Sequence, residues 1–131
     1  MNNIIQFQTI NWDLIPRTKH AGENGIAYWQ TIMFVDIRIR IVEYSPNYKA
    51  NHWCEKGHII YCLKGQMTTY LKDGTMHIIK EGMSYQTSDN KENPHRSSTI
   101  EGCKLFIIDG NFFKREFVMK LCHLMVFASM T

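Results

Sequence analysis

Hydrophobic and polar residues alternate strictly in the segment IRIRI, at positions 37–41. Because successive side chains of a strand point to opposite faces, this pattern predicts a β-strand with three isoleucines on one face. Arg38 and Arg40 fall on the other face, which we interpret as the solvent face. The longer run from Tyr28 to Tyr44 predicts either one long strand or two short ones.

Further strand-like segments follow, separated by turn residues. Lys64-Gly65 divides two of them, Asp73-Gly74 is a strong signal for a two-residue hairpin, and Glu81-Gly82 indicates another turn. Residues 90–94, NKENP, are typical of a loop. The predicted strands are HIIYCL (58–63), QMTTYL (66–71), MHIIK (76–80), MSYQTS (83–88) and CKLFIID (103–109). Short strands with this spacing, without a β-α-β rhythm, predict an all-β antiparallel sandwich or barrel.

The end of the chain has a different pattern. The segment from residue 110, GNFFKREFVMKLCHLMVFASMT, is rich in Phe, Leu and Met. Helical spacing of its apolar residues predicts a possible C-terminal helix that covers a sheet edge or contacts a second subunit; the alternative is a loose tail. These apolar residues are Phe113, Phe117, Leu121, Leu124 and Met125. We therefore expect one barrel domain over residues 1–109, with its core at 37–109, and an extension over 110–131.

Composition excludes several classes of function. With 131 residues, 44% hydrophobic and 21% charged, the chain is expected to fold as one ordinary globular domain. The net charge of +3 is small and the basic residues are scattered, so nucleic acid is not an expected partner. No apolar run is long enough to predict a membrane span, and the N-terminus does not resemble a secretory signal. The four cysteines show no paired framework, so we expect reduced thiols in a cytoplasmic protein.

The segment NHWCEKGH, residues 51–58, carries the candidate chemistry. On a strand His52 and Cys54 would point the same way, and His58 opens the next predicted strand. His95 follows Pro94 near the end of a loop, and a barrel could bring all four side chains together at one mouth. Imidazole and thiolate are the usual ligands of zinc, and with an open position they also suit iron, nickel or copper.

Each of these residues also has an ordinary structural interpretation. The spacing H-x-C-x3-H is loose, so His52 and His58 could be polar barrel residues with hydrogen-bond partners. His95 could be a loop imidazole in solvent, and Cys54 could fill space in the core. The other cysteines are interpreted as structural: Cys62, Cys103 and Cys122.

Other residues are candidates for binding a small molecule. Tyr44, Tyr61 and Tyr85 could line a pocket, and Tyr85 could donate a proton, although aromatic residues of small barrels more often serve packing. Arg96, next to His95, is the better candidate for holding an anionic ligand.

From about Pro46 to Asp109 the chain resembles the cupin family of small β-barrels, which carry two short motifs. YCLKG (61–65) resembles the end of the first motif. Counting back from it, His52 and Cys54 fall at the two positions of the usual H-x-H, and His58 falls where cupins usually have Glu. Gly82 and Pro94-His95 are similar to the second motif.

A closer resemblance is to a small bacterial subgroup of cupins with a DHCW motif. It extends over most of residues 7–109, through segments such as GENGIAYWQT, DIRIRIVEYSPNY and NHWCEKGHIIYCLKG. The subgroup has Asp before His-Trp-Cys, whereas this chain has Asn51. Asn would keep a ligand-orienting hydrogen bond, but it could not serve as a base.

The resemblance implies a single cupin barrel, a double-stranded β-helix or jelly-roll-like fold, and a divalent metal ion, Fe, Zn, Ni or Mn. The implied ligands are His52, His58 and His95, with Cys54 as a possible fourth. The implied partners are a small-molecule ligand and a second copy of the chain in a homodimer. Two functions stay open: a metal-dependent enzyme, such as an oxygenase or isomerase acting on a small polar or anionic molecule, and a non-catalytic module that binds or senses a metabolite or metal.

Overall fold

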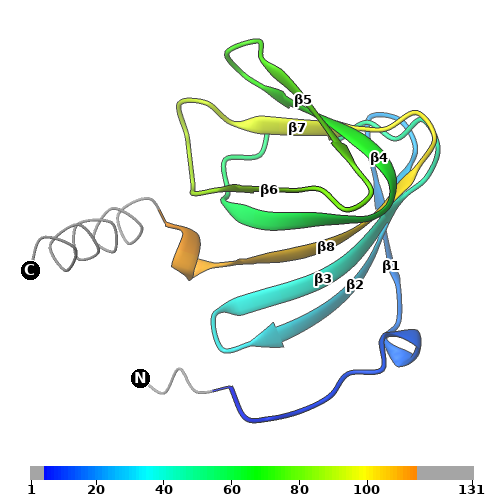
Figure 1. The fold of residues 1–131 in the computed structure, drawn as a ribbon, viewed down its shortest axis with the longest axis vertical. Coiled ribbons are helices and arrows are strands. Elements are labelled where there is room, and N and C mark those ends of the chain that lie inside the picture. The colour runs from blue at the N-terminus through cyan, green and yellow to red at the C-terminus, as the bar shows by residue number, and fades with distance from the viewer. Residues whose placement is uncertain (1–4, 115–131) are drawn as a thin grey trace, which may run out of the picture.

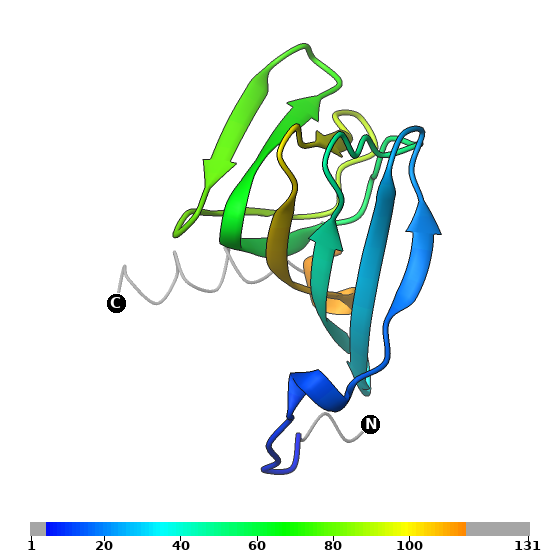
Figure 2. The same cartoon turned by 90° about the vertical axis from the view of Figure 1, so that its right-hand side faces the viewer.

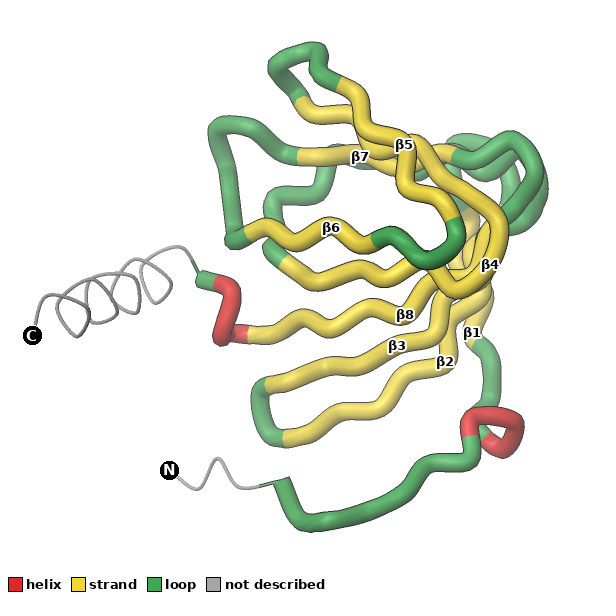
Figure 3. The backbone as a smooth tube through the Cα atoms, in the orientation of Figure 1, coloured by secondary structure: helices red, strands yellow, loops and turns green. Residues whose placement is uncertain are grey.

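A computed structural model describes residues 5–114, and within them the chain consists mainly of antiparallel strands (Figures 1 and 3). Short 3-10 helices, η1 (Trp12–Leu14) and η2 (Asn111–Phe113), flank the strands. The strands are β1 (Thr18–Ala21), β2 (Ile26–Phe34), β3 (Ile37–Tyr44), β4 (His58–Leu71), β5 (Met76–Lys80), β6 (Ser84–Thr87), β7 (His95–Ser98) and β8 (Cys103–Gly110). No helix within the described residues is long and apolar enough to cross a membrane.

The strand order β1-β2-β3-β8-β4-β5 curves into a barrel-like shape because β4 belongs to both of its walls (Figures 1 and 2). The first half of β4 pairs with β6 and β8, whereas its second half pairs with β5 and β7. The prediction of two separate strands, 58–63 and 66–71, is therefore wrong, since they form one bent strand.

The bend in β4 has a local cause in the sequence. The register shifts between Cys62 and Lys64, and Gly65 follows with a φ of 77°. A Cβ at Gly65 would lie 2.5 Å from the carbonyl oxygen of Gly102, which is far too close. The position therefore requires glycine, both for its backbone conformation and for the close approach of a second chain segment.

Most of the other predicted strands and turns are confirmed. The run 28–44 forms two strands, β2 and β3, and a turn at Asp73-Gly74 joins β4 to β5. The predicted two-residue form of this turn is wrong: Leu71 N–H donates to the carbonyl oxygen of Thr75 at 2.9 Å, which leaves a three-residue loop, and Gly74 has a positive φ of 96° whereas Asp73 does not. Residues 90–94 form a loop, and β8 covers the predicted strand 103–109. The sequence analysis missed β1, which pairs with β2 before residue 37. The predicted C-terminal helix falls largely on residues 115–131, which lie outside the described residues.

The assignment of faces in β3 is wrong in the sequence analysis. Arg40 is only 6% exposed and faces the barrel interior, in register with Thr31 and Ile107. The alternating isoleucines lie on the outer face, where Ile41 is in register with Phe106 of β8. Strict alternation reveals that a strand has two faces, but a buried arginine needs a carboxylate partner that lies elsewhere in the chain.

The core lies between the two walls of the barrel. Its buried apolar residues are Ala27, Val42, Tyr48, Ile60, Cys62, Met67, Ile79, Cys103, Leu105 and Ile107. The prediction that Cys62 and Cys103 are structural is confirmed, since both are buried free thiols in this cluster. Cys122 lies outside the described residues. The apolar cluster forms the floor beneath the cavity described next.

Candidate functional site

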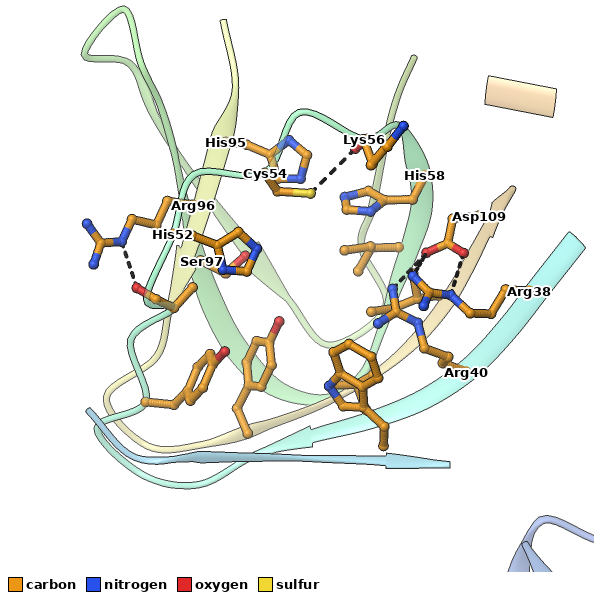
Figure 4. A pocket seen from close by; sticks show the side chains of 17 residues that line it. Arg38, Arg40, His52, Cys54, Lys56, His58, His95, Arg96, Ser97 and Asp109 are labelled. Atoms are coloured by element: carbon orange, nitrogen blue, oxygen red, sulfur yellow. Dashed lines mark hydrogen bonds and ion pairs between the residues drawn. The ribbon is translucent and has the colours of Figure 1, made fainter. Parts of the chain in front are cut away.

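The four predicted ligands line one cavity of about 280 Å³ inside the barrel (Figure 4). His52 and Cys54 lie in the loop between β3 and β4, His58 is the first residue of β4, and His95 is the first residue of β7. Two backbone hydrogen bonds between Cys54 and His95, of 2.7 and 2.9 Å, tie this loop to β7. Residues far apart in the sequence are thereby brought together at one site.

His58 and His95 form the buried part of this group. Their rings lie 4.6 Å apart between centroids, and the two residues are 7% and 6% exposed. The buried Nε2 atom of His95 has no hydrogen-bond partner, which is costly for a buried polar atom unless a ligand engages it. Burial, with smaller effects from His95 and Arg40, lowers the pKa of His58 to about 3. Burial also lowers the pKa of His95, so both imidazoles favour the neutral form that binds metal ions.

The Tyr85 hydroxyl lies 2.8 Å from Nε2 of His58. Burial raises the pKa of Tyr85, so the phenol stays protonated. Tyr85 does not line the 280 Å³ cavity; it lines a second cavity of about 260 Å³, which also includes His95. It contacts the site through the His58 hydrogen bond and through its ring, which meets the His95 ring edge-to-face at 6.1 Å between centroids.

His52 and Cys54 stand closer to solvent. Nδ1 of His52 lies 2.7 Å from Oδ1 of Asn51, and because an amide oxygen only accepts, Nδ1 is the donor; in the neutral imidazole Nε2 then has the lone pair. Burial raises the pKa of the Cys54 thiol, whose Sγ lies 3.9 Å from the carbonyl oxygen of Lys56. Across residues 5–114, no three His, Cys, Asp or Glu side chains are gathered closely enough to hold an ion as they stand.

A cluster of charges lines the wall of the cavity formed by β3 and β8 (Figure 4). Arg38 donates to both carboxylate oxygens of Asp109, at 2.8 and 3.0 Å, and Arg40 donates to one of them at 2.7 Å. Burial raises the pKa of Asp109, but the hydrogen bonds and charges of the two arginines outweigh it and hold this pKa below its usual value. The guanidinium carbon of Arg40 also lies 4.4 Å from the ring centroid of Trp29.

Sequence reasoning missed this cluster because Asp109 is about seventy residues from its partners along the chain. The one available signal was a carboxylate at the end of the otherwise apolar segment LFIID. Such a residue in a buried strand needs a positively charged partner.

The predicted substrate-binding residues differ in their surroundings. Tyr44 lines the cavity and stacks on Tyr48, with ring centroids 4.1 Å apart. Arg96 lies at the edge of the cavity, but its Nε donates to the carbonyl oxygen of Ala50 and its Nη2 to Glu23, both at 2.7 Å. Its guanidinium group is therefore largely engaged by the protein itself.

No protein-family model matches the sequence, and no curated protein matches it significantly. Solved structures do match the fold. A sugar phosphate isomerase of the cupin superfamily from Silicibacter pomeroyi has 12% identity and a TM-score of 0.65, over 79% of this chain and 76% of that chain. A cupin-like protein from Thermotoga maritima has 16% identity and a TM-score of 0.62, over 75% and 80%. Fe(II)-HppE with an alternative substrate has 13% identity and a TM-score of 0.65, over 79% and 60%.

At these identities the likeness bears on the fold and not on the activity. It agrees with the antiparallel strands described above. The chain therefore has the fold of the cupin proteins, a single β-barrel.

Proposed function

We propose that the protein is a metal-binding cupin that acts on a small molecule held in the 280 Å³ cavity. The observation that carries the proposal is the buried, unpartnered Nε2 of His95, which lies beside the ring of His58. An imidazole nitrogen without a partner is a donor available to a cation, and a second imidazole is in reach of the same ion.

The donor set fits a divalent ion such as iron, zinc, nickel or manganese. His58 and His95 would supply the first two donors. His52 would turn its free Nε2 inward, and Cys54 would complete the set after losing its proton, which its raised pKa makes costly. When bound, such an ion polarises a substrate oxygen or lowers the pKa of a coordinated water.

Neighbouring residues would orient the ligands. A metal-binding histidine usually donates its other ring N–H to an oxygen, which fixes the ring. The Tyr85 hydroxyl is in position to accept from Nε2 of His58, and Asn51 accepts from Nδ1 of His52. Asn51 would thus keep the orienting part of the role that the DHCW resemblance gives to Asp.

A second candidate function is a binding or sensing module without turnover. Among the described residues that line the cavity, Asp109 is the one carboxylate, and two arginines engage it. It is therefore poorly suited to act as a general base, because its proton affinity is lowered. From the sequence resemblance we also propose membership of the DHCW subgroup and a homodimer. From the cysteine pattern and the chain length we propose a cytoplasmic location and a single domain over residues 1–109.

The proposal is tested by the metal content of full-length protein purified without a histidine tag and offered each ion, with iron(II) kept anaerobic. We expect about one ion per chain in the wild type and loss of that ion in His58→Ala and His95→Ala. His77→Ala is the matched control, because His77 is exposed on β5 and does not line this cavity. Protein that binds none of the four ions would overturn the proposal.

The remaining donors and the two functions are separated by further measurements. His52→Ala and Cys54→Ala should weaken the affinity for the ion if these side chains turn inward as proposed. Oxygen uptake and a metabolite turnover screen on the loaded protein distinguish an enzyme from a binder. Metal binding without any turnover would favour the sensing module.

A further inference from the structure

Two arginines of β3 face the cavity, but only one carboxylate balances them. Arg38 and Arg40 both donate to Asp109, which accepts three hydrogen bonds from them. Two guanidinium groups and one carboxylate leave one excess positive charge at this wall. Asp109 is buried and Arg40 is 6% exposed, whereas the Arg38 side chain is 36% exposed, so water compensates the charge of Arg40 poorly.

Arg40 also keeps an unused donor. Its buried Nε atom has no hydrogen-bond partner, although the guanidinium group is held in place by Asp109 and by the ring of Trp29. A buried donor without a partner is uncommon and points to a missing acceptor. A planar guanidinium group with a fixed orientation is well suited to donate to a carboxylate oxygen as that acceptor.

The other charged groups of the cavity do not provide this excess charge. Arg96 is paired with Glu23 at the edge of the cavity, and Lys56 is exposed to solvent. The floor of the cavity is apolar and includes Val42, Ile60 and Ile107. The positive charge that a bound anion would meet inside the cavity therefore lies at Arg38 and Arg40.

We infer that Arg38 and Arg40 bind the carboxylate of a small monocarboxylic acid, which is the substrate or ligand class of this site. The inference deepens the function proposed above and rests on it for the role of the histidines. A single excess positive charge matches a monoanion better than a dianion such as phosphate. The cavity volume of about 280 Å³ limits the acid to a small molecule.

The binding mode follows from the arrangement of the walls. Figure 4 shows the arginines and Asp109 on one wall and His52, Cys54 and His95 across the cavity from them. An acid whose carboxylate lies at Arg38 and Arg40 therefore extends its remaining atoms over the apolar floor toward the histidines. Asp109 acts as a positioning residue, because its hydrogen bonds hold both guanidinium groups at this wall.

Binding of propionate, lactate and pyruvate to full-length, chelator-treated protein tests the inference, by titration calorimetry and ligand-observed NMR. 1-Propanol and inorganic phosphate serve as uncharged and dianionic comparators. Arg40→Gln and Arg38→Gln each remove the excess charge but leave one arginine to pair with Asp109. Arg17→Gln is the matched control, since Arg17 is exposed, pairs with Glu43 and does not line this cavity.

We expect at least one acid to bind with a Kd of about 1 mM or lower, and both cavity variants to raise that Kd by about tenfold or more. Arg17→Gln should leave it within about twofold. Circular dichroism checks folding, and Arg38→Gln carries the test if Arg40→Gln does not fold, because the Arg38 side chain is 36% exposed.

Three results would overturn the inference: no acid bound at about 50 mM, phosphate bound more tightly than every acid, or unchanged acid affinity in both cavity variants. Because the titration uses metal-free protein, it is independent of the metal test. Acid binding without metal binding would contradict the proposed metal centre alone, and metal binding without acid binding would contradict the carboxylate site alone.

Discussion

Asp109 should be one of the most costly polar residues of the barrel to neutralise. Its carboxylate is buried and joins two arginines of β3 to β8 through three hydrogen bonds. Asp109→Asn leaves Arg40 buried without a counter-charge, and breaking a buried ion pair in this way costs about 3–5 kcal/mol. Because Arg38 is partly exposed, we expect a loss near the lower end, about 3 kcal/mol.

Urea denaturation followed by far-UV circular dichroism at pH 7 measures this loss. A drop of about 3 kcal/mol is a large part of the 5–15 kcal/mol typical of a domain, so the midpoint should shift clearly. Glu43→Gln is the control, because it breaks an ion pair with Arg17 in which both side chains are more than 40% exposed. We expect that exposed pair to contribute about 1 kcal/mol or less.

The pH dependence provides a second check with a defined sign. The folded-state pKa of Asp109 lies below its usual value of 3.8, so the stabilisation is present above that value and is lost as pH falls through the folded-state pKa. Asp109→Asn should therefore lose less stability than the wild type on acidification below about pH 4. A loss at pH 7 no larger than that of Glu43→Gln, with an unchanged acid profile, would refute the reasoning.

Three further outcomes are expected. Gly65→Ala should destabilise the fold by about 1–3 kcal/mol or more in urea denaturation, whereas Gly74→Ala, where a Cβ meets open space, should cost about 1 kcal/mol; equal losses would contradict the steric argument. Tyr85→Phe removes the contact with His58 and should weaken metal affinity by about 10–100-fold in a chelator competition assay, and unchanged affinity would argue against an orienting role. The raised pKa of Cys54 should make its alkylation by iodoacetamide at neutral pH slower than in the unfolded chain, as read by peptide mass spectrometry; equal rates would show an unshielded thiol.

The sequence was most informative where a local pattern determines structure. Asp73-Gly74 marked the turn between β4 and β5, although not its two-residue form, and the apolar segment 103–109 specified the strand β8. Lys64-Gly65 was misread as a strand boundary because a glycine at a bulge and a glycine in a turn give the same local signal.

The residues of the candidate site likewise divide into those that a local sequence pattern could predict and those that it could not. His52, Cys54 and His58 could be expected together because they lie within seven residues of one another. The face of Arg38 and Arg40 could not be predicted, because alternation does not state which face is buried and their partner Asp109 lies on a distant strand. Whether these arginines face solvent or the cavity depends on pairing between strands, and a local sequence pattern carries no information on that pairing.

The register of three strands therefore builds both parts of the cavity. Asp109 of β8 is in register with Arg38 of β3 on one side and with His58 of β4 on the other. A slip of one residue in β8 would turn Asp109 to the outer face, and both arginines would lose their counter-charge. One alignment of backbone hydrogen bonds thus positions two features. These are the charge cluster that we propose binds a carboxylate, and His58, the first proposed metal ligand. A variant that weakens this alignment should affect stability, acid binding and metal binding together, whereas Arg38→Gln, which leaves the alignment intact, should affect mainly acid binding.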